Sequence, residues 1–143
     1  MRKNCNHELL KNKGIELTAH RKRVFDIITT TPKALTPKVI LSQIRRNHTM
    51  DKVTLYRILN LFVNKKIARR ISGQHGRIFY EIVCEDHRPV HSHFVCRQCG
   101  EMECLEDLPI KELKAKLKSH AFGEDNDIDL KLEGICMECK KVH

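Results

Sequence analysis

The spacing of apolar residues predicts four helices in the first half of the chain. Residues 4–13 form a weakly helical segment, and a second helix begins after Thr18, which is suited to cap it, and ends before Pro32. A third helix starts at Thr36-Pro37, because proline is favoured at the first helical position, and fades at Asn47-His48.

The fourth helix carries the clearest pattern. Asp51 can cap its first turn, and apolar residues then recur at i, i+3, i+4 and i+7, which is one face of a helix. These residues are Leu55, Ile58, Leu59 and Phe62. The pattern leaves a second set of side chains largely outside the apolar face, and this set comprises Lys52, Thr54, Tyr56, Arg57 and Asn60.

Two short strand-like runs follow, residues 67–71 and 77–83, joined by a turn rich in glycine and polar residues. Helices followed by a hairpin at this size predict a winged helix-turn-helix domain over residues 1–83. Residues 84–90 are polar and read as a hinge.

The second half has a different pattern. Residues 92–96 and 102–105 are predicted to pair as strands, residues 108–120 form an amphipathic helix, and residues 128–132 alternate as a half-buried strand should. The predicted fold class is therefore α+β, with the winged helix followed by a small α/β domain over residues 91–143.

Charge divides the chain at the same place. Residues 1–83 hold 18 Lys and Arg against 5 Asp and Glu, whereas residues 84–143 hold 9 against 13. A basic first half is typical of a partner of nucleic acid, although a solvated lysine-rich surface gives the same count. The start lacks the apolar core of a signal peptide and no apolar run approaches a membrane span, so we expect a cytoplasmic protein.

Four cysteines carry the strongest chemical signal. Cys96 and Cys99 form one Cys-x-x-Cys pair, and Cys136 and Cys139 form a second. Each pair can direct two thiolates at one ion, so together they predict one structural Zn²⁺ per chain in a closed tetrahedral site. A single pair could instead be a redox dithiol, but two pairs favour the metal.

The remaining ligand candidates require a second ion. His91 and His93 point to one face of the predicted strand, Cys104 lies on its partner strand, and Cys84 lies in the hinge. Other candidates and the plainer interpretation stay open: Glu81 or His87 could replace Cys84, the cysteines could be small buried hydrophobes, and the histidines could be surface residues.

The exposed face of the fourth helix is the candidate DNA contact. Arg57 can reach guanine edges or phosphates, and Tyr56 can pack on a thymine methyl group. A solvated helix face is the alternative for the helix alone, and the hairpin and the basic charge favour DNA.

With these residues in view, the chain resembles the ferric uptake regulator family over almost its whole length. The motifs that carry the resemblance are Leu17–Arg21, Val53–Leu59, His93–Gly100 and Gly134–Cys139. The resemblance implies a homodimeric, metal-dependent bacterial repressor that binds a palindromic double-stranded operator through an N-terminal winged helix, with a C-terminal dimerisation domain. It also adds Arg21, in the first motif, to the expected DNA contacts.

The departures from the iron and peroxide sensors point to the zinc uptake regulators within this family. Those sensors usually carry a ligand histidine where this chain has Ala34-Leu35 and an acidic ligand where it has Cys104. Thiolate-rich sites suit zinc, so Zn²⁺ is expected at the regulatory site, with Fe²⁺ or Mn²⁺ as alternatives. One position disagrees, because a hinge ligand common in zinc sensors falls near Arg69.

An enzyme is the competing class. A zinc deaminase needs a glutamate two positions after a ligand histidine, and the His91-Ser92-His93 stretch supplies none. Neither cysteine cluster leaves an open metal position beside a general base, so the sequence predicts no enzyme.

Overall fold

The computed structural model describes residues 6–83, 92–105, 109–117 and 130–141. The chain divides into two compact units, Met1–Val90 and His91–His143, which we describe separately. The expected hinge, residues 84–90, lies outside the described residues, as does part of the weakly helical segment at the N-terminus.

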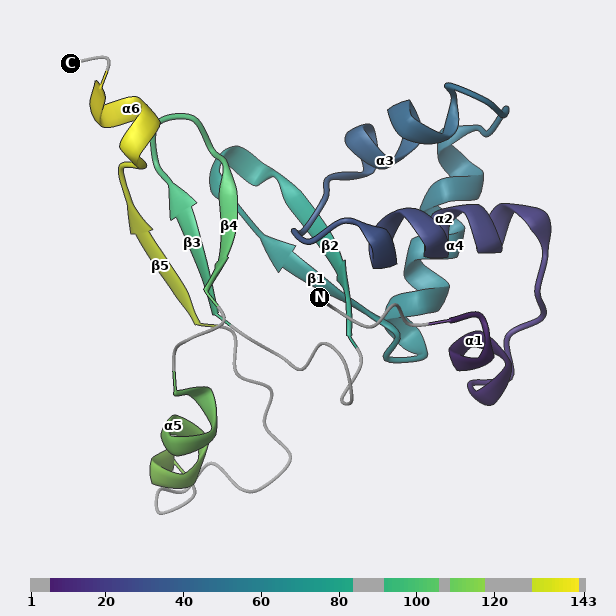
Figure 1. Cartoon of the computed structure of the whole chain (residues 1–143), viewed down its shortest axis with the longest axis horizontal. Coiled ribbons are helices and arrows are strands. Elements are labelled where there is room, and N and C mark those ends of the chain that lie inside the picture. Colours follow the sequence, from purple (N-terminus) through teal and green to yellow (C-terminus); the bar gives the residue numbers. More distant parts are fainter. Residues whose placement is uncertain (1–5, 84–91, 106–108, 118–129, 142–143) are drawn as a thin grey trace. The chain divides into compact units, whose positions relative to one another are not determined.

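The first unit contains four described helices, of which the last three begin with a side-chain cap. The helices are α1 (Glu8–Asn12), α2 (Ala19–Thr30), α3 (Pro37–Ile44) and α4 (Lys52–Asn64) (Figure 1). Thr18 accepts a hydrogen bond from the Arg21 backbone N–H at 3.2 Å. Thr36 accepts one from Val39 at 3.3 Å, and Asp51 accepts one from Thr54 at 2.7 Å. The three predicted caps are thus confirmed.

Helix α3 ends three residues earlier than the sequence pattern predicts. The Ile44 carbonyl accepts hydrogen bonds from both Asn47 and His48, at 3.3 and 3.0 Å, which closes the chain into a turn. The Arg45 side chain also donates its Nε–H to the Met50 carbonyl at 3.1 Å, holding the segment that leads into α4.

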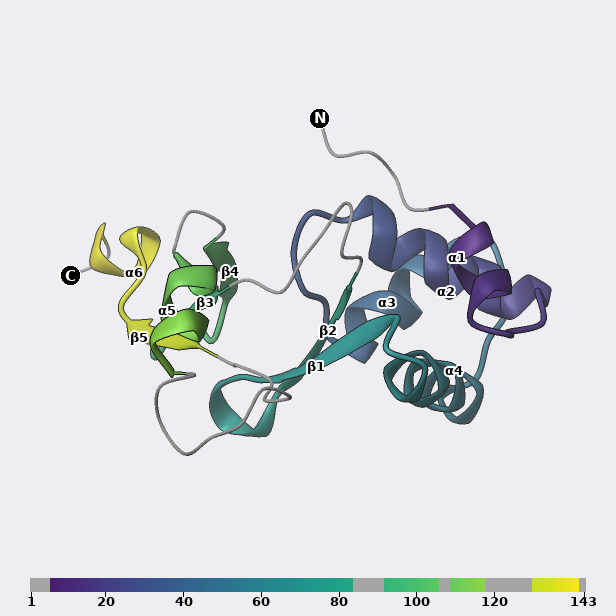
Figure 2. The same cartoon turned by 90° about the horizontal axis from the view of Figure 1, so that it is seen from below.

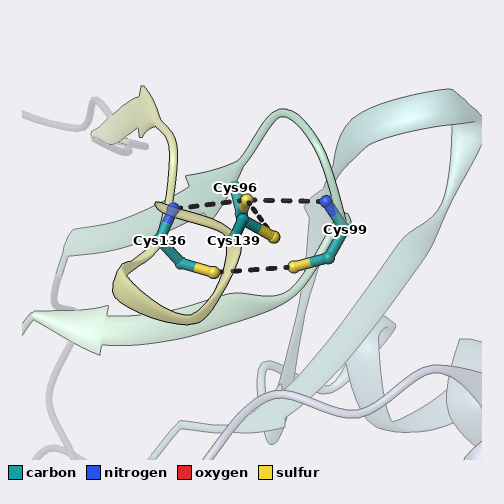
Figure 3. Close-up of side chains that lie close together, drawn as sticks. All are labelled: Cys96, Cys99, Cys136 and Cys139. Carbon is teal, nitrogen blue, oxygen red and sulfur yellow. Dashed lines mark hydrogen bonds between the residues drawn. The ribbon is translucent and has the colours of Figure 1, made fainter. Parts of the chain in front are cut away.

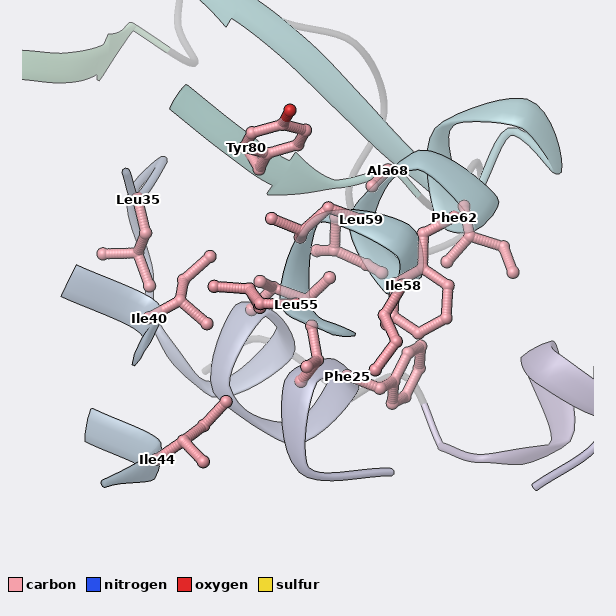
Figure 4. Packing of buried hydrophobic residues seen from close by; sticks show 14 of the residues in the cluster. Phe25, Leu35, Ile40, Ile44, Leu55, Ile58, Leu59, Phe62, Ala68 and Tyr80 are labelled. Carbon is pink, nitrogen blue, oxygen red and sulfur yellow. The ribbon is translucent and has the colours of Figure 1, made fainter. Parts of the chain in front are cut away.

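The core of the first unit lies under the apolar face of α4. Leu55, Leu59 and Phe62 are fully buried and Ile58 nearly so, which confirms the predicted stripe. Figure 4 shows these side chains directed at residues from α2, α3 and the hairpin. Phe62 meets Phe25 of α2 edge to face, with the ring centroids 6.3 Å apart.

Helix α1 is tied to α2, beside which it lies in both views (Figures 1 and 2). The His7 ring packs against the edge of Phe25 at a centroid distance of 5.7 Å. Its Nε2 lies 2.7 Å from a carboxylate oxygen of Asp26.

The wing is the antiparallel hairpin of β1 (Ala68–Ser72) and β2 (Ile78–Ile82), in which Ala68 pairs with Ile82. The connecting segment contains the short 3-10 turn Gln74–Gly76. Leu35 adds an antiparallel bridge to Tyr80, with reciprocal backbone hydrogen bonds of 2.9 and 2.7 Å. The sequence pattern does not predict this bridge, which ties the segment before α3 to the wing.

The second unit is a small sheet with strand order β4-β3-β5. Its strands are β3 (Ser92–Cys96), β4 (Met102–Leu105) and β5 (Lys131–Gly134), and its helices are α5 (Ile110–Leu117) and α6 (Met137–Lys141). Strands β3 and β4 pair antiparallel as predicted, and β3 pairs with β5 in parallel. The mixed helix and strand content and the winged helix confirm the predicted fold class.

Strand β5 differs from the prediction. It begins at Lys131, three residues later than expected, while residues 128 and 129 lie outside the described part of the chain. Leu132, expected on a half-buried face, is 46% exposed. Among the strands that the structure describes, β5 forms an edge of the sheet and has β3 as its one neighbour. No helix in the described residues is long and apolar enough to cross a membrane.

The Thr36 cap can be tested directly. We expect Thr36→Ala to destabilise the protein by about 1 kcal/mol, because the Val39 N–H loses its acceptor at the start of α3. Thermal unfolding followed by helical circular dichroism measures the change. Thr36→Ser, which keeps the hydroxyl, is the control, and equal losses in both variants would show that the cap contributes nothing.

Candidate metal centre and nucleic-acid interface

Four cysteine sulfurs converge at one end of the second unit (Figure 3). The Sγ atoms of Cys96 and Cys139 lie 3.8 Å apart, and those of Cys99 and Cys136 lie 3.9 Å apart. All four Sγ atoms lie within 4.8 Å of one another. The structure therefore brings together the four residues that the sequence predicts for the structural metal.

The sulfur spacing fits a tetrahedral ion. With zinc–sulfur bonds of about 2.3 Å, neighbouring sulfurs of a regular tetrahedron lie about 3.8 Å apart. A disulfide would instead require about 2.05 Å between the two sulfurs. The 3.8 Å between Cys96 and Cys139 matches the metal geometry and excludes a disulfide between them.

Two local structures aim the sulfurs. Strand β3 ends at Cys96, and the chain turns through Gly100, whose φ of +77° favours glycine, before β4 begins. Cys136 stands just before α6, and Cys139 lies within that helix. Sequence spacing predicts the ligands but not this last helix, which is only five residues long.

Backbone amides prepare the cluster for negative charge. The N–H groups of Cys136 and Cys99 donate to the Cys96 sulfur at 3.4 and 3.5 Å. These bonds, the one from Cys136 first, lower the pKa of the Cys96 thiol to about 6. The pKa of Cys139 is raised to about 12, chiefly by its hydrogen bond with the Cys136 thiol and then by burial. One thiolate therefore forms readily at Cys96, and a bound cation would favour a thiolate at Cys139.

His93 and Cys104 form a second pair of ligand-type side chains. They are direct partners across the antiparallel β3–β4 ladder, so their side chains project from the same face of the sheet. A ring nitrogen of His93 and the Cys104 sulfur lie within 4.8 Å of each other. His93 is fully buried and Cys104 partly buried. The other two residues predicted for the regulatory site, Cys84 and His91, and the alternative His87 lie outside the described residues.

Glu81, the other alternative ligand, has a cationic neighbour within its own hairpin. It pairs with Arg69 in the β1–β2 register, and one of its carboxylate oxygens lies 3.9 Å from an Arg69 guanidinium nitrogen. Arg69 therefore offsets the charge of Glu81. It is the residue that stands near a position where zinc sensors often have a ligand.

The predicted DNA-contact residues lie on the outer side of α4. Lys52 and Arg57 are exposed, Tyr56 is 44% exposed, and Thr54 is partly buried. The backbone N–H of Thr54 lowers the pKa of Asp51, which keeps this cap ionised at the start of the helix. Arg21, at the start of α2, donates from its guanidinium to the Glu16 carbonyl at 2.9 Å.

A basic groove runs between α3 and the first turns of α4. Its volume is about 700 Å³, and Lys38, Arg45, Arg46, Lys52 and Tyr56 are among its lining residues. Sequence reasoning missed the three cations on the α3 side. Lys38 lies within α3, whereas Arg45 and Arg46 follow its end at Ile44, so their signal in the sequence is basic charge rather than helical spacing.

A winged helix with a cationic groove, together with a unit whose four cysteine sulfurs are spaced to hold a metal ion, is typical of a metal-dependent DNA-binding protein. The model of the ferric uptake regulator family matches residues 12–133. The chain belongs to that family, whose members are metal-responsive transcriptional regulators and not enzymes.

Individual proteins of this family are similar to the chain over most of its length. The ferric uptake regulation protein of Staphylococcus epidermidis is 30% identical over 135 residues, covering 94% of this chain and 93% of its own. The iron-containing structure of the Francisella tularensis ferric uptake regulator is 25% identical, with a TM-score of 0.70 over 89% of this chain and 96% of its own. The Vibrio cholerae regulator is 23% identical, with a TM-score of 0.73 over 92% of this chain and all of its own. The similarity to the Vibrio cholerae structure is a similarity of fold alone.

The four-sulfur cluster generates a test. We expect Cys136→Ser to lose one metal ion per chain and to unfold the second unit, because the tetrahedral shell then lacks a thiolate. Elemental analysis measures the metal, and limited proteolysis shows which unit is cut. The helices of the first unit should survive, so most of the helical signal should remain.

Cys5→Ser is the matched control, because Cys5 belongs to neither predicted metal site. It should behave like the unaltered protein. A folded second unit with undiminished metal content in Cys136→Ser would contradict a structural role for the cluster.

Proposed function

We propose that this protein is a zinc-responsive transcriptional repressor that binds a palindromic operator as a homodimer when its regulatory site is loaded with Zn²⁺. Its place of action is then the cytoplasm. In this proposal Cys96, Cys99, Cys136 and Cys139 hold a second, structural Zn²⁺.

The observation that carries the proposal is the His93–Cys104 pair. A thiolate beside an imidazole on one face of the sheet is a donor set that suits Zn²⁺, whereas carboxylate and imidazole sets suit Fe²⁺ and Mn²⁺ better. Ligands on directly paired strand positions are also held rigidly, so two of the four bonds need little reorganisation.

The proposed site is completed by Cys84 and His91. Cys84 is preferred to His87 because it adds a second thiolate, and to Glu81 because that carboxylate lies close to Arg69. A shell of two thiolates and two imidazoles is one of the common tetrahedral zinc sets.

An iron-responsive regulator is the second candidate, and the names of the relatives favour it. The Staphylococcus epidermidis relative is named a ferric uptake regulation protein, and the Francisella tularensis structure contains iron. In that case His91 and His93 would act with Glu81 in place of Cys84. The proposal follows the donor atoms of this chain, since affinity order alone does not select the metal.

The metal would control DNA binding because its ligands come from the hinge and from the second unit. When bound, Zn²⁺ supplies a cross-link between side chains of the hinge and of β3 and β4. Cys84 and His91 would thereby restrict the segment that joins the two units. An effector of this kind acts by favouring one arrangement over another, and typical coupling energies correspond to affinity changes of about 5- to 150-fold.

The homodimer is supported by apolar surface on the second unit. Leu132 on edge strand β5 and Met137 at the start of α6 are both exposed, at 46% and 69%. An unpaired strand edge with an exposed apolar side chain is a usual place for another chain to bind. Two copies would present two α4 helices to successive major grooves, about 34–36 Å apart.

The regulatory assignment is tested by Cys104→Ser combined with metal analysis. The unaltered protein should contain two zinc ions per chain, and mild chelation should remove one of them and weaken operator binding at least fivefold. Cys104→Ser should retain one zinc ion and a folded dimer but gain no DNA affinity from added Zn²⁺. Elemental analysis, sizing and fluorescence anisotropy with operator DNA measure these three properties.

Cys5→Ser again serves as the control and should respond to Zn²⁺ normally. Zinc-dependent DNA binding of ordinary strength in Cys104→Ser would overturn the assignment. If buffered Fe²⁺, but not buffered Zn²⁺, restores operator binding to the chelated protein, the iron-responsive alternative is established.

The α4 contacts are tested by two substitutions with different expected signatures. Arg57→Ala should weaken specific binding by about 1–3 kcal/mol and relax selectivity at one base pair, as expected for an arginine that reads a guanine. Lys52→Ala should weaken binding to all sequences and reduce the slope of log K against log salt by about 1, as expected for a phosphate contact. Identical effects of both changes on all sequences would show that Arg57 reads no base.

A further inference from the structure

Helix α4 exposes an apolar side chain at a place where packing does not require one. Val53, in the first turn, is 59% exposed, more than any other large apolar side chain in the described part of the first unit. It is absent from the buried cluster of that unit and from the partly buried residues packed against it. Valine is also a poorer helix former than alanine. The side chain therefore contributes little to the core or to the helix.

The neighbours of Val53 are the proposed DNA contacts. On a helix, residues three and four positions apart lie next to each other, which places Val53 beside Tyr56 and Arg57. It also directly follows Lys52, which lines the basic groove between α3 and α4. Val53 is thus an apolar position within a polar and cationic surface.

The chemistry of valine limits what it can recognise there. In helix-turn-helix proteins the N-terminal residues of the recognition helix approach the base edges in the major groove. A valine side chain has no hydrogen-bond donor or acceptor, and thymine alone among the bases presents a methyl group in that groove. Opposite any other base, a polar edge would lose water without gaining a partner.

We propose that Val53 is a specificity-determining residue that reads a thymine methyl group, at a base pair next to those contacted by Tyr56 and Arg57. This inference rests on the proposed DNA recognition by α4. It predicts that the operator half-site contains a thymine whose 5-methyl group is needed for full affinity, and that Val53 is the side chain that senses it.

The experiment removes single methyl groups from the DNA. A preferred duplex is first selected from a randomised pool with the metal-loaded protein. Each thymine is then replaced by deoxyuridine, which lacks only the 5-methyl group. Affinities are measured for the unaltered protein, for Val53→Ala and for Val39→Ala. Val39 is the matched control, since it is an exposed valine on α3 rather than α4.

For the unaltered protein we expect replacement of one thymine to weaken binding about fourfold, because one buried methyl group is lost. This thymine is distinct from any that Tyr56 contacts. Val53→Ala should be insensitive to that replacement, while Val39→Ala should retain the full fourfold effect. Val53→Ala should remain folded, because alanine favours the helix.

Two negative outcomes have different meanings. If Val53→Ala binds the selected duplex and still loses affinity at every thymine that matters to the unaltered protein, Val53 reads no methyl group and the inference is wrong. If the unaltered, metal-loaded protein selects no duplex from the pool, the proposed repressor function itself fails.

Discussion

The second unit depends on the convergence of four cysteine sulfurs. In its described residues, the buried apolar side chains are limited to Val95, Cys96 and Met102, and a sheet of three short strands gains little stability from so small a core. The cysteines connect the end of β3 to the segment around α6, which follows β5. An ion at this cluster would thus hold the ends of β3 and β5 together and stabilise the strand order β4-β3-β5.

The first unit is held together differently, by a continuous apolar core under α4. One side of this helix is buried against α2, α3 and the wing, so the opposite side is presented to solvent in a fixed orientation. The Asp51 cap fixes where the helix begins, and therefore which residues occupy its first turn. The same packing that stabilises the fold thereby positions the side chains that we propose to read DNA.

Much of this organisation follows from local sequence signals. The caps at Thr36 and Asp51 and the spacing of the Cys-x-x-Cys pairs depend on neighbouring residues, and the structure agrees with each. The signals fail where contacts are non-local. The Leu35–Tyr80 bridge joins segments 45 positions apart, and the start of β5 is set by its parallel pairing with β3 rather than by its own alternation. Patterning also cannot show that Arg69 lies beside Glu81, because that contact depends on the register of the hairpin.

Strand β3 carries Cys96 of the sulfur cluster and His93 of the His93–Cys104 pair, and alternation along the strand separates the two side chains. His93 and Cys96 are three positions apart, so their side chains leave the sheet on opposite faces. The sulfur cluster and the His93–Cys104 pair consequently both use strand β3 but lie on opposite faces of the sheet. In the proposed function, an ion held by the sulfur cluster and an ion bound at the His93–Cys104 pair would therefore lie on opposite faces of β3, so that one could exchange while the other stays bound. In the proposed function, one short strand would thus keep the structural ion apart from the regulatory ion.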